Sequence, residues 1–296
     1  MTDPPPIKPV FLAEICWYQQ KPVIMHTTIP AATDRQQHTV VSAEEWASAR
    51  RRLLEKEKAF TRLRDELNRE RLELPWERVE KTYRFEGPRG TETLADLFDG
   101  RSQLMVYHFM FGPGWEEGCP SCSFLTDHID GTLVHLANRD ITLLLVSRAP
   151  LGQIEAFKKR MGWQVKWVSS YGSDFNYDYQ VSFREEDKAK GQVYYNYGPA
   201  EFIAEDLHGL SVFYKNGQGE VFHTYSTYGR GCDMLVGTYN YMDLAPKGRD
   251  EDQLNFTMSW VRHHDRYDQQ YTVDPAAAYQ PPKATGSCCH GEGGDS

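Results

Sequence analysis

The chain lacks long hydrophobic runs, an excess of positive charge and a dense set of cysteines. No run of about 18 apolar residues occurs, so no segment is long enough to cross a membrane. A formal net charge of -9, from 33 lysines and arginines against 42 acidic residues, argues against a general nucleic-acid binder, which carries a clustered basic face. Six cysteines in 296 residues are too sparse for the disulfide framework of a secreted domain. We therefore expect a cytoplasmic protein whose partners include neither nucleic acid nor a membrane.

The N-terminal residues also lack the features of a secretion signal. Residues 10–16 are apolar, but Glu14 interrupts them, and prolines rather than basic residues precede them. Residues 1–40 are expected to form a disordered lead, in which Met25 is an alternative start. Residues 272–296 are rich in Pro, Ala, Gly and Ser and are expected to form a flexible tail.

A long helix is predicted after the lead, within residues 41–76. Ser42 and Glu45 have the spacing of a capping box, and the following residues to about Leu74 contain neither Gly nor Pro. Pro75 ends the helix. Its apolar stripe, expected to pack on the rest of the fold or on a second copy, consists of Trp46, Leu53, Leu54, Phe60, Leu63 and Leu67. Because the helix is longer than a compact core, we expect a homodimer.

Residues 77–271 alternate strand-like and helix-like segments and are predicted to form one domain. Strands are expected at 79–86, 104–111, 141–147, 210–215 and 220–225, and helices at 123–136, 151–161 and about 233–244. Gly87-Pro88-Arg89-Gly90 predicts a turn, and Asn216-Gly217-Gln218-Gly219 predicts a hairpin. The aromatic segment between residues 163 and 208 is expected to be irregular. Strand and helix alternating at these lengths indicate an α/β fold with a parallel core.

Cys119-Pro120-Ser121-Cys122 is the most informative motif of the sequence. Its two thiols lie where an apolar strand gives way to a predicted helix, which is typical of a redox dithiol. At a helix N-terminus the first thiol faces unpaired backbone N–H groups and the positive end of the helix dipole, and both favour the thiolate. Glu116 and Glu117 act in the opposite sense, so the direction of the net pKa shift stays open. Half of a zinc ribbon has the same spacing, but the chain has no second C-x-x-C.

Several longer motifs resemble an uncharacterised bacterial thioredoxin-like family that is catalogued as a domain of unknown function. These motifs span residues 107–113, 118–123, 168–176 and 260–265, and the likeness covers about residues 40–270. Residues 83–98 also resemble the N-terminal addition of peroxiredoxins and of membrane-associated thiol reductants. The resemblance implies an α/β, thioredoxin-like fold within the thioredoxin and peroxiredoxin superfamily. It further implies a central mixed sheet flanked by helices, with the long helix and a β-hairpin as N-terminal extensions.

The sequence departs from thioredoxins beside the predicted site. Thioredoxins place a Trp directly before the dithiol and a cis-Pro directly before the hairpin strand. Here Trp115 lies four residues upstream of Cys119, and Leu210-Ser211 occupies the proline site. The resemblance therefore implies substrate binding at an apolar rim of Phe111 and Trp115 and at the altered backbone edge of Leu210 and Ser211.

Other chemistry-bearing residues have simpler expected roles. His108 and His128 are expected to be structural, His263-His264 is expected to be a polar helix end, and Cys232 is expected to be a lone buried thiol. The aromatic clusters from Tyr171 to Tyr179 and from Tyr194 to Tyr197 are expected in the core or an interface rather than in a ligand cleft.

We predict a thiol–disulfide oxidoreductase without a cofactor, in which Cys119 attacks a protein or small-molecule disulfide and Cys122 resolves the mixed disulfide. The first alternative is a thiolate metal-binding or redox-sensing module. Its candidate ligands are Cys119, Cys122, Cys288, Cys289 and His290, with His128 as a further candidate. The second alternative is a thiol peroxidase. Peroxiredoxins need a Thr or Ser three residues before the reactive Cys, and Glu116 stands there for Cys119.

Overall fold

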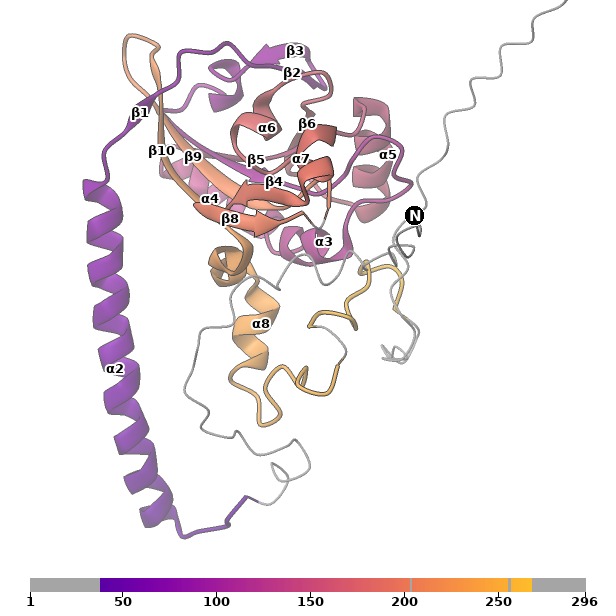
Figure 1. Cartoon of the computed structure of the whole chain (residues 1–296). Coiled ribbons are helices and arrows are strands. Elements are labelled where there is room, and N and C mark those ends of the chain that lie inside the picture. The colour runs from indigo at the N-terminus through magenta and orange to yellow at the C-terminus, as the bar shows by residue number, and fades with distance from the viewer. Residues whose placement is uncertain (1–37, 203, 255–256, 268–296) are drawn as a thin grey trace, which may run out of the picture.

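The computed structural model describes residues 38–202, 204–254 and 257–267. The long helix α2 (Ala43–Glu73) stands beside the rest of the chain and reaches it at its C-terminal end (Figure 1). The Ser42 hydroxyl accepts from the Glu45 N–H at 3.3 Å, and the Glu45 carboxylate accepts from the Ser42 N–H at 3.0 Å. The predicted capping box is therefore confirmed at this helix N-terminus.

The remaining strands and helices follow in close succession. The strands are β1 (Glu77–Arg78), β2 (Arg84–Gly87), β3 (Gly90–Thr93), β4 (Gln103–His108), β5 (Ile141–Ser147), β6 (Lys166–Ser169), β7 (Gln192–Tyr195), β8 (Gly198–Glu201), β9 (Gly209–Lys215) and β10 (Val221–Tyr228). The helices are α3 (Pro120–Thr126), α4 (Leu133–Asn138), α5 (Leu151–Met161), α6 (Phe175–Asp178), α7 (Glu185–Lys190) and α8 (Gly237–Met242). Short 3-10 helices span Asp96–Phe98, Asp130–Thr132 and Gly229–Leu235.

The main sheet is mixed, with the strand order β1-β10-β9-β4-β5-β6-β2-β3. β4, β5 and β6 are parallel to their neighbours in this group, whereas β9 runs antiparallel to β4 and β10 antiparallel to β9. The order β10-β9-β4-β5, with helices between β4 and β5 and after β10, is that of the thioredoxin fold. The expected α/β, thioredoxin-like fold with a mixed sheet is confirmed. The expected N-terminal hairpin is β2–β3, which joins the sheet through β6.

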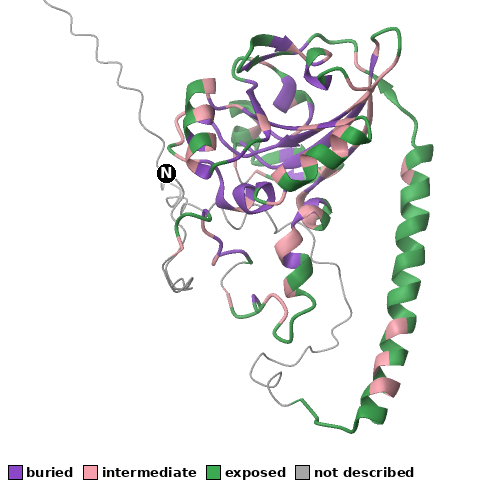
Figure 2. Cartoon of the chain, turned by 180° about the vertical axis from the view of Figure 1, so that it is seen from behind, coloured by how far each residue is buried: buried purple, intermediate pink, exposed green. Residues whose placement is uncertain are grey.

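The sheet separates two apolar cores. The dithiol-side core contains Tyr107 of β4 and Leu145 of β5 together with both cysteines of the motif, and α3 and α5 contribute to it. The opposite core contains Val106 and Leu144 from the same two strands and Phe175 of α6. Successive residues of a strand point to opposite faces, which is why neighbours in sequence enter different cores. Figure 2 shows the buried sheet and the largely exposed α2.

Some predicted elements differ from the observed ones. The helix expected at residues 123–136 is divided by Asp127–Ile129 and the Asp130–Thr132 3-10 turn. The Asp130 carboxylate accepts from the backbone N–H groups of Gln164 and Val165 at 2.7 and 2.9 Å. A tertiary contact thus replaces the continuous helix. The segment between residues 163 and 208, expected to be irregular, contains β6, α6, α7 and the β7–β8 hairpin.

His108 has a structural role, as expected. Because its ring is buried, we expect the free energy of unfolding to decrease in acid. Its ring is buried, stacks on Phe175 with centroids 5.4 Å apart, and lies 2.9 Å from the Ser211 hydroxyl. Burial, together with the charge of His223, lowers the pKa of His108 to about 3. Below pH 6.5 the unfolded chain therefore binds a proton at this residue that the folded chain does not bind. Because of this proton, the free energy of unfolding should decrease by about 1.4 kcal/mol for each pH unit by which the pH is lowered below 6.5.

Urea unfolding between pH 7 and pH 5 tests this expectation. His108→Phe should reduce the pH slope by about one proton relative to the native chain. His135→Phe, at an exposed position of α4, provides the control for replacing a histidine by a phenylalanine. An unchanged slope in His108→Phe would show that His108 does not contribute.

Candidate functional site

The dithiol lies just beyond the carboxyl end of β4, where Cys119 is the N-cap of α3 and Pro120 is its first residue. The backbone of Met110 holds both cysteines. Its carbonyl accepts from the Cys119 N–H at 3.0 Å, and its N–H donates to the Cys122 sulfur at 3.5 Å. Gly118 allows this close approach, because a Cβ there would lie 2.5 Å from the Phe109 ring. The loop therefore fixes the two thiols relative to the end of the central strand.

The two thiols differ in exposure. Both are buried and neither is part of a disulfide bond, and Cys119 is 9% exposed whereas Cys122 is 1% exposed. Of the pair, Cys119 therefore keeps the larger exposed area. Cys122 lies in the protein interior, where its side chain contacts Cys119 and Tyr107 of β4.

Burial, followed by its contact with Cys119, raises the pKa of the Cys122 thiol well above the ordinary value. Hydrogen bonds from the Tyr107 hydroxyl and the Met110 N–H act in the opposite sense, because they stabilise the thiolate. Cys122 is therefore a protonated thiol near neutral pH, with two donors already placed at its sulfur.

A cavity of about 10 Å³ lies against Cys122, which is about the space that one water needs. Tyr107, His208 and Cys232 share its lining with Cys122. His208 Nε2 lies 3.2 Å from the Gly229 carbonyl, which can only accept, so Nε2 carries the proton. Burial lowers the pKa of His208 and raises that of Cys232 to about 12. Neither Tyr107 nor His208 was predicted from the sequence as a residue of the site. Of the two, only Tyr107 lies close to the dithiol in the sequence, because it belongs to the strand before the motif.

The segment after residue 256 closes over the dithiol loop. His263 is buried, its Nε2 lies 2.8 Å from the Gly118 carbonyl, and its Nδ1 lies 3.2 Å from the Arg160 guanidinium. Because a carbonyl only accepts and Arg only donates, His263 is neutral with its proton on Nε2. Burial lowers the pKa of His263 in agreement with this state. The expected polar helix end is wrong, since residues 261–267 form no helix.

Glu117 is an ion-pair centre rather than a solvated loop acid. Its carboxylate accepts from Arg160 and Arg266, each at 2.6 Å, and lies 3.3 Å from His263 Nδ1. The two guanidinium groups offset its charge beside Cys119. Glu116, in contrast, is exposed.

His263→Ala should increase the reactivity of Cys119. The change removes a buried hydrogen bond to Gly118, which costs about 1–3 kcal/mol, so local opening should become roughly tenfold more frequent. The measurement is the rate of Cys119 carbamidomethylation by iodoacetamide, followed by mass spectrometry. His264→Ala is the matched control, because His264 is 44% exposed and bonds to Asp127 instead. Equal rates of Cys119 carbamidomethylation in the two variants would show that the His263 contact does not restrict access to Cys119.

The four predicted substrate-binding residues lie in different environments. Trp115 is partly exposed and packs on the dithiol-side core. Phe111 and Leu210 are buried in that core at 1% and 4% exposure, so neither side chain forms an accessible rim. Ser211 is fully buried and bonds to His108 and Ser226, on the opposite face of the sheet from the dithiol. No cis peptide bond occurs before β9 in the described chain.

The metal-binding alternative gains no further ligand within the described residues. These residues contain no group of three or more His, Cys, Asp or Glu side chains that could hold a metal ion. His128 is structural, since its Nε2 accepts from the Thr238 N–H at 3.1 Å. Cys288, Cys289 and His290 lie outside the described residues, as do the expected tail at 272–296 and most of the lead.

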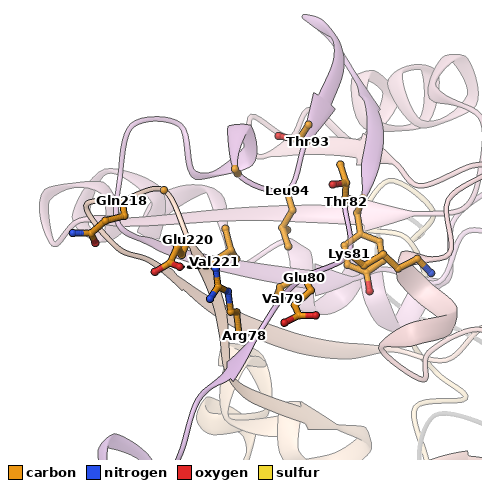
Figure 3. Close-up of a pocket in the computed structure, with 13 residues that line it drawn as sticks. Arg78, Val79, Glu80, Lys81, Thr82, Thr93, Leu94, Gln218, Glu220 and Val221 are labelled. Atoms are coloured by element: carbon orange, nitrogen blue, oxygen red, sulfur yellow. Dashed lines mark ion pairs between the residues drawn. The ribbon is translucent and has the colours of Figure 1, made fainter.

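A wider hollow of about 730 Å³ lies at the other end of the sheet (Figure 3). The β1–β2 connection and the β9–β10 turn line it, and Arg78 pairs with Glu220 across its edge at 2.6 Å. Because β9 is antiparallel to β4, this turn lies at the amino end of β4, away from the dithiol. Its lining contains no cysteine or histidine, so we assign it no chemistry.

Comparisons with known proteins give a family and a set of distant structural neighbours. A family model described as "Bacterial protein of unknown function (DUF899)" matches residues 35–267. No curated protein matches the chain. Within the described residues, no helix combines the length and the apolar character needed to cross a membrane.

The solved structures that resemble the chain have low identity. Peroxiredoxin Q of Xanthomonas campestris is 12% identical over 57% of this chain and 98% of its own, with a TM-score of 0.37. Peroxidoxin BcpB from Mycobacterium tuberculosis is 10% identical over 56% and 95%, with a TM-score of 0.34. A putative thiol:disulfide interchange protein DsbE from Chlorobium tepidum is 13% identical over 59% and 99%, with a TM-score of 0.35. The thioredoxin-like fold of the chain is shown by its strand order.

Proposed function

The chain belongs to this family of bacterial proteins of unknown function, and from the geometry of its dithiol we propose that it is a thiol–disulfide oxidoreductase. The proposed substrate is a protein or small-molecule disulfide. The observation that carries the proposal is a Cys-Pro-Ser-Cys dithiol at the helix N-terminus after the central strand, with one thiol more exposed than the other.

Cys119 is the proposed attacking residue because it is the more exposed of the two cysteines and is the N-cap of α3. Its thiolate attacks one sulfur of the substrate disulfide, so that a Cys119–substrate S–S bond forms and the substrate S–S bond breaks. The first substrate sulfur leaves as a thiolate and takes up a proton from water. This step needs no bound cofactor.

Cys122 is the proposed resolving residue. It loses its proton, attacks the Cys119 sulfur and forms the Cys119–Cys122 disulfide, while the second substrate sulfur leaves and takes up that proton. The substrate disulfide is then reduced by two electrons and the protein dithiol is oxidised by two. The hydrogen bonds from Tyr107 and Met110 support this role, because they would stabilise the Cys122 thiolate as it forms. An external dithiol returns the protein to its reduced form.

Reversible oxidation of the full-length protein tests the proposal. Reduced protein is equilibrated with oxidised dithiothreitol, denatured, alkylated and digested. We expect a peptide in which Cys119 is linked to Cys122, and we expect excess reduced dithiothreitol to remove this link. The Cys232→Ser protein should behave identically. If Cys119 and Cys122 stay fully alkylatable at every ratio of oxidant to reductant, the proposal is wrong.

A further inference from the structure

Helix α2 exposes a row of large apolar side chains. None of its residues is buried, and Trp46 and Phe60 are 61% and 66% exposed. Its contact with the domain is at the C-terminal end, where the Arg71 guanidinium lies 5.5 Å from the centre of the Tyr225 ring. Figure 2 shows α2 exposed along most of its length. Because most helical stability in proteins comes from packing, such a helix needs a partner surface.

The spacing of these side chains specifies the geometry of the partner. Trp46, Leu53, Phe60, Leu67 and Leu74 follow one another at intervals of seven residues. This repeat corresponds to 3.5 residues per turn, which is the period of a left-handed coiled coil. We call these five residues the seam and assign them to heptad position a. Position d then holds Ala49, Lys56, Leu63 and Glu70.

The charges beside the seam favour a parallel pair of identical helices. In a parallel pair, each g residue faces the e residue five positions later on the other helix. Glu45 would face the partner's Arg50, Arg52 the partner's Glu57, and Glu66 the partner's Arg71. Arg50 and Glu57 also pair with each other within α2 at 2.7 Å, so the contacts with the partner would extend this ion pair. All three pairs have opposite charge, and each occurs twice by symmetry. The remaining pair, Ala59 with the partner's Arg64, is neutral in effect.

An antiparallel pair is disfavoured by the same residues. There, e residues face e residues, and three of the four in α2 are arginine, namely Arg50, Arg64 and Arg71. Lys56 and Glu70 at position d would face their own copies in the parallel pair. Such charged layers lower the stability of a coiled coil, so the dimer should be moderately stable.

We propose that α2 forms a parallel two-stranded coiled coil with α2 of a second copy of this chain. The homodimer expected from the sequence thereby gains a defined interface. This proposal is independent of the dithiol chemistry.

Light scattering of the full chain across micromolar concentrations tests the interface. The native protein should have a mass of about 68 kDa, twice that of the 34.1 kDa chain. Phe60→Ser should raise the dimer dissociation constant roughly tenfold or more, because it removes a central seam residue. Leu72→Ser is the matched control. Leu72 is 84% exposed and lies off the seam, so this variant should stay dimeric. A native mass of 34 kDa, or a dimer equally stable in Phe60→Ser, would overturn the proposal.

Two further variants test the orientation. Ala49→Cys places a thiol at position d, where it meets its own copy only in the parallel arrangement, so oxidation should cross-link the dimer through residue 49. Arg52→Glu should weaken the dimer by repelling the partner's Glu57, and adding Glu57→Arg should restore it. Failure of both the cross-link and the restoration would exclude the parallel coiled coil.

Discussion

Cys119→Ser is expected to lower the rate of disulfide reduction by about 10³-fold or more, because it removes the attacking sulfur. The measurement is the steady-state reduction of insulin or oxidised glutathione by the full-length protein, with dithiothreitol as electron donor. Cys122→Ser should also abolish turnover, but by a different route. It should allow one attack per molecule and then stop at the mixed disulfide.

Cys232→Ser is the matched control for the loss of a buried thiol. The Cys232 sulfur lies 3.8 Å from the Thr227 carbonyl, and it has no part in the proposed exchange. This variant should retain activity within about threefold. A Cys119→Ser protein with unchanged turnover would rule out the assignment of Cys119.

Asp206→Ala is expected to destabilise the fold by about 3–5 kcal/mol. The Arg148 and Asp206 side chains are 13% and 5% exposed and form a bidentate pair at 2.6 and 3.0 Å. Burial lowers the pKa of Arg148, but Asp206 raises it further, so the net shift is upward. Without Asp206, the buried guanidinium would keep only the exposed Glu205 carboxylate, 3.9 Å away, as an ionic partner. The pair also joins the end of β5 to the segment that carries His208.

Urea denaturation of the two single variants, Asp206→Ala and Glu205→Ala, measures this cost. Glu205 is the adjacent residue, but its side chain is 53% exposed, and its carboxylate lies 3.3 Å from Lys188 and 3.9 Å from Arg148. Glu205→Ala should therefore cost no more than about 1 kcal/mol. Equal unfolding midpoints for the two variants would contradict the stated importance of the buried pair. Gly112→Ala should also be costly, since a Cβ there would lie 2.8 Å from Asp206 Oδ2.

Local signals in the sequence were sufficient for several elements. The bounds expected for β5 and α5 agree with the structure, because a continuous apolar run defines the strand and Gly162 ends the helix in a left-handed conformation with φ of 70°. The hairpin at Asn216 was also predictable from local sequence, because its turn residues determine its conformation. Its side chain accepts from the N–H groups of Gln218 and Glu220 within the turn.

Elements defined by distant contacts could not be predicted in this way. β6 has only four residues, and it is a strand because it pairs with β5 and β2. The break after Thr126 depends in part on Asp127, whose carboxylate accepts from Trp163 Nε1 at 2.8 Å. The sequence around Asp127 and the sequence around Trp163 do not indicate that these two residues are in contact.

The candidate site likewise has a part that could be predicted from local sequence and a part that depends on distant contacts. The spacing of Cys119 and Cys122 is visible in the sequence. His208 and His263 join the site through the strand order and the C-terminal segment, about 90 and 140 residues later. The misplacement of Ser211 has the same origin. A shift of one residue along a strand moves a side chain to the opposite face, and only the observed register decides which residue faces the dithiol.

Trapping the mixed disulfide is the decisive test of whether Cys119 attacks a substrate disulfide. Full-length Cys122→Ser protein is reacted with oxidised glutathione and mapped by peptide mass spectrometry without reduction. We expect one glutathione per chain, attached to Cys119, whereas the native protein under the same conditions should form the Cys119–Cys122 disulfide. A trapped protein without an adduct on Cys119, or with its adduct on Cys232 instead, would contradict the proposed function.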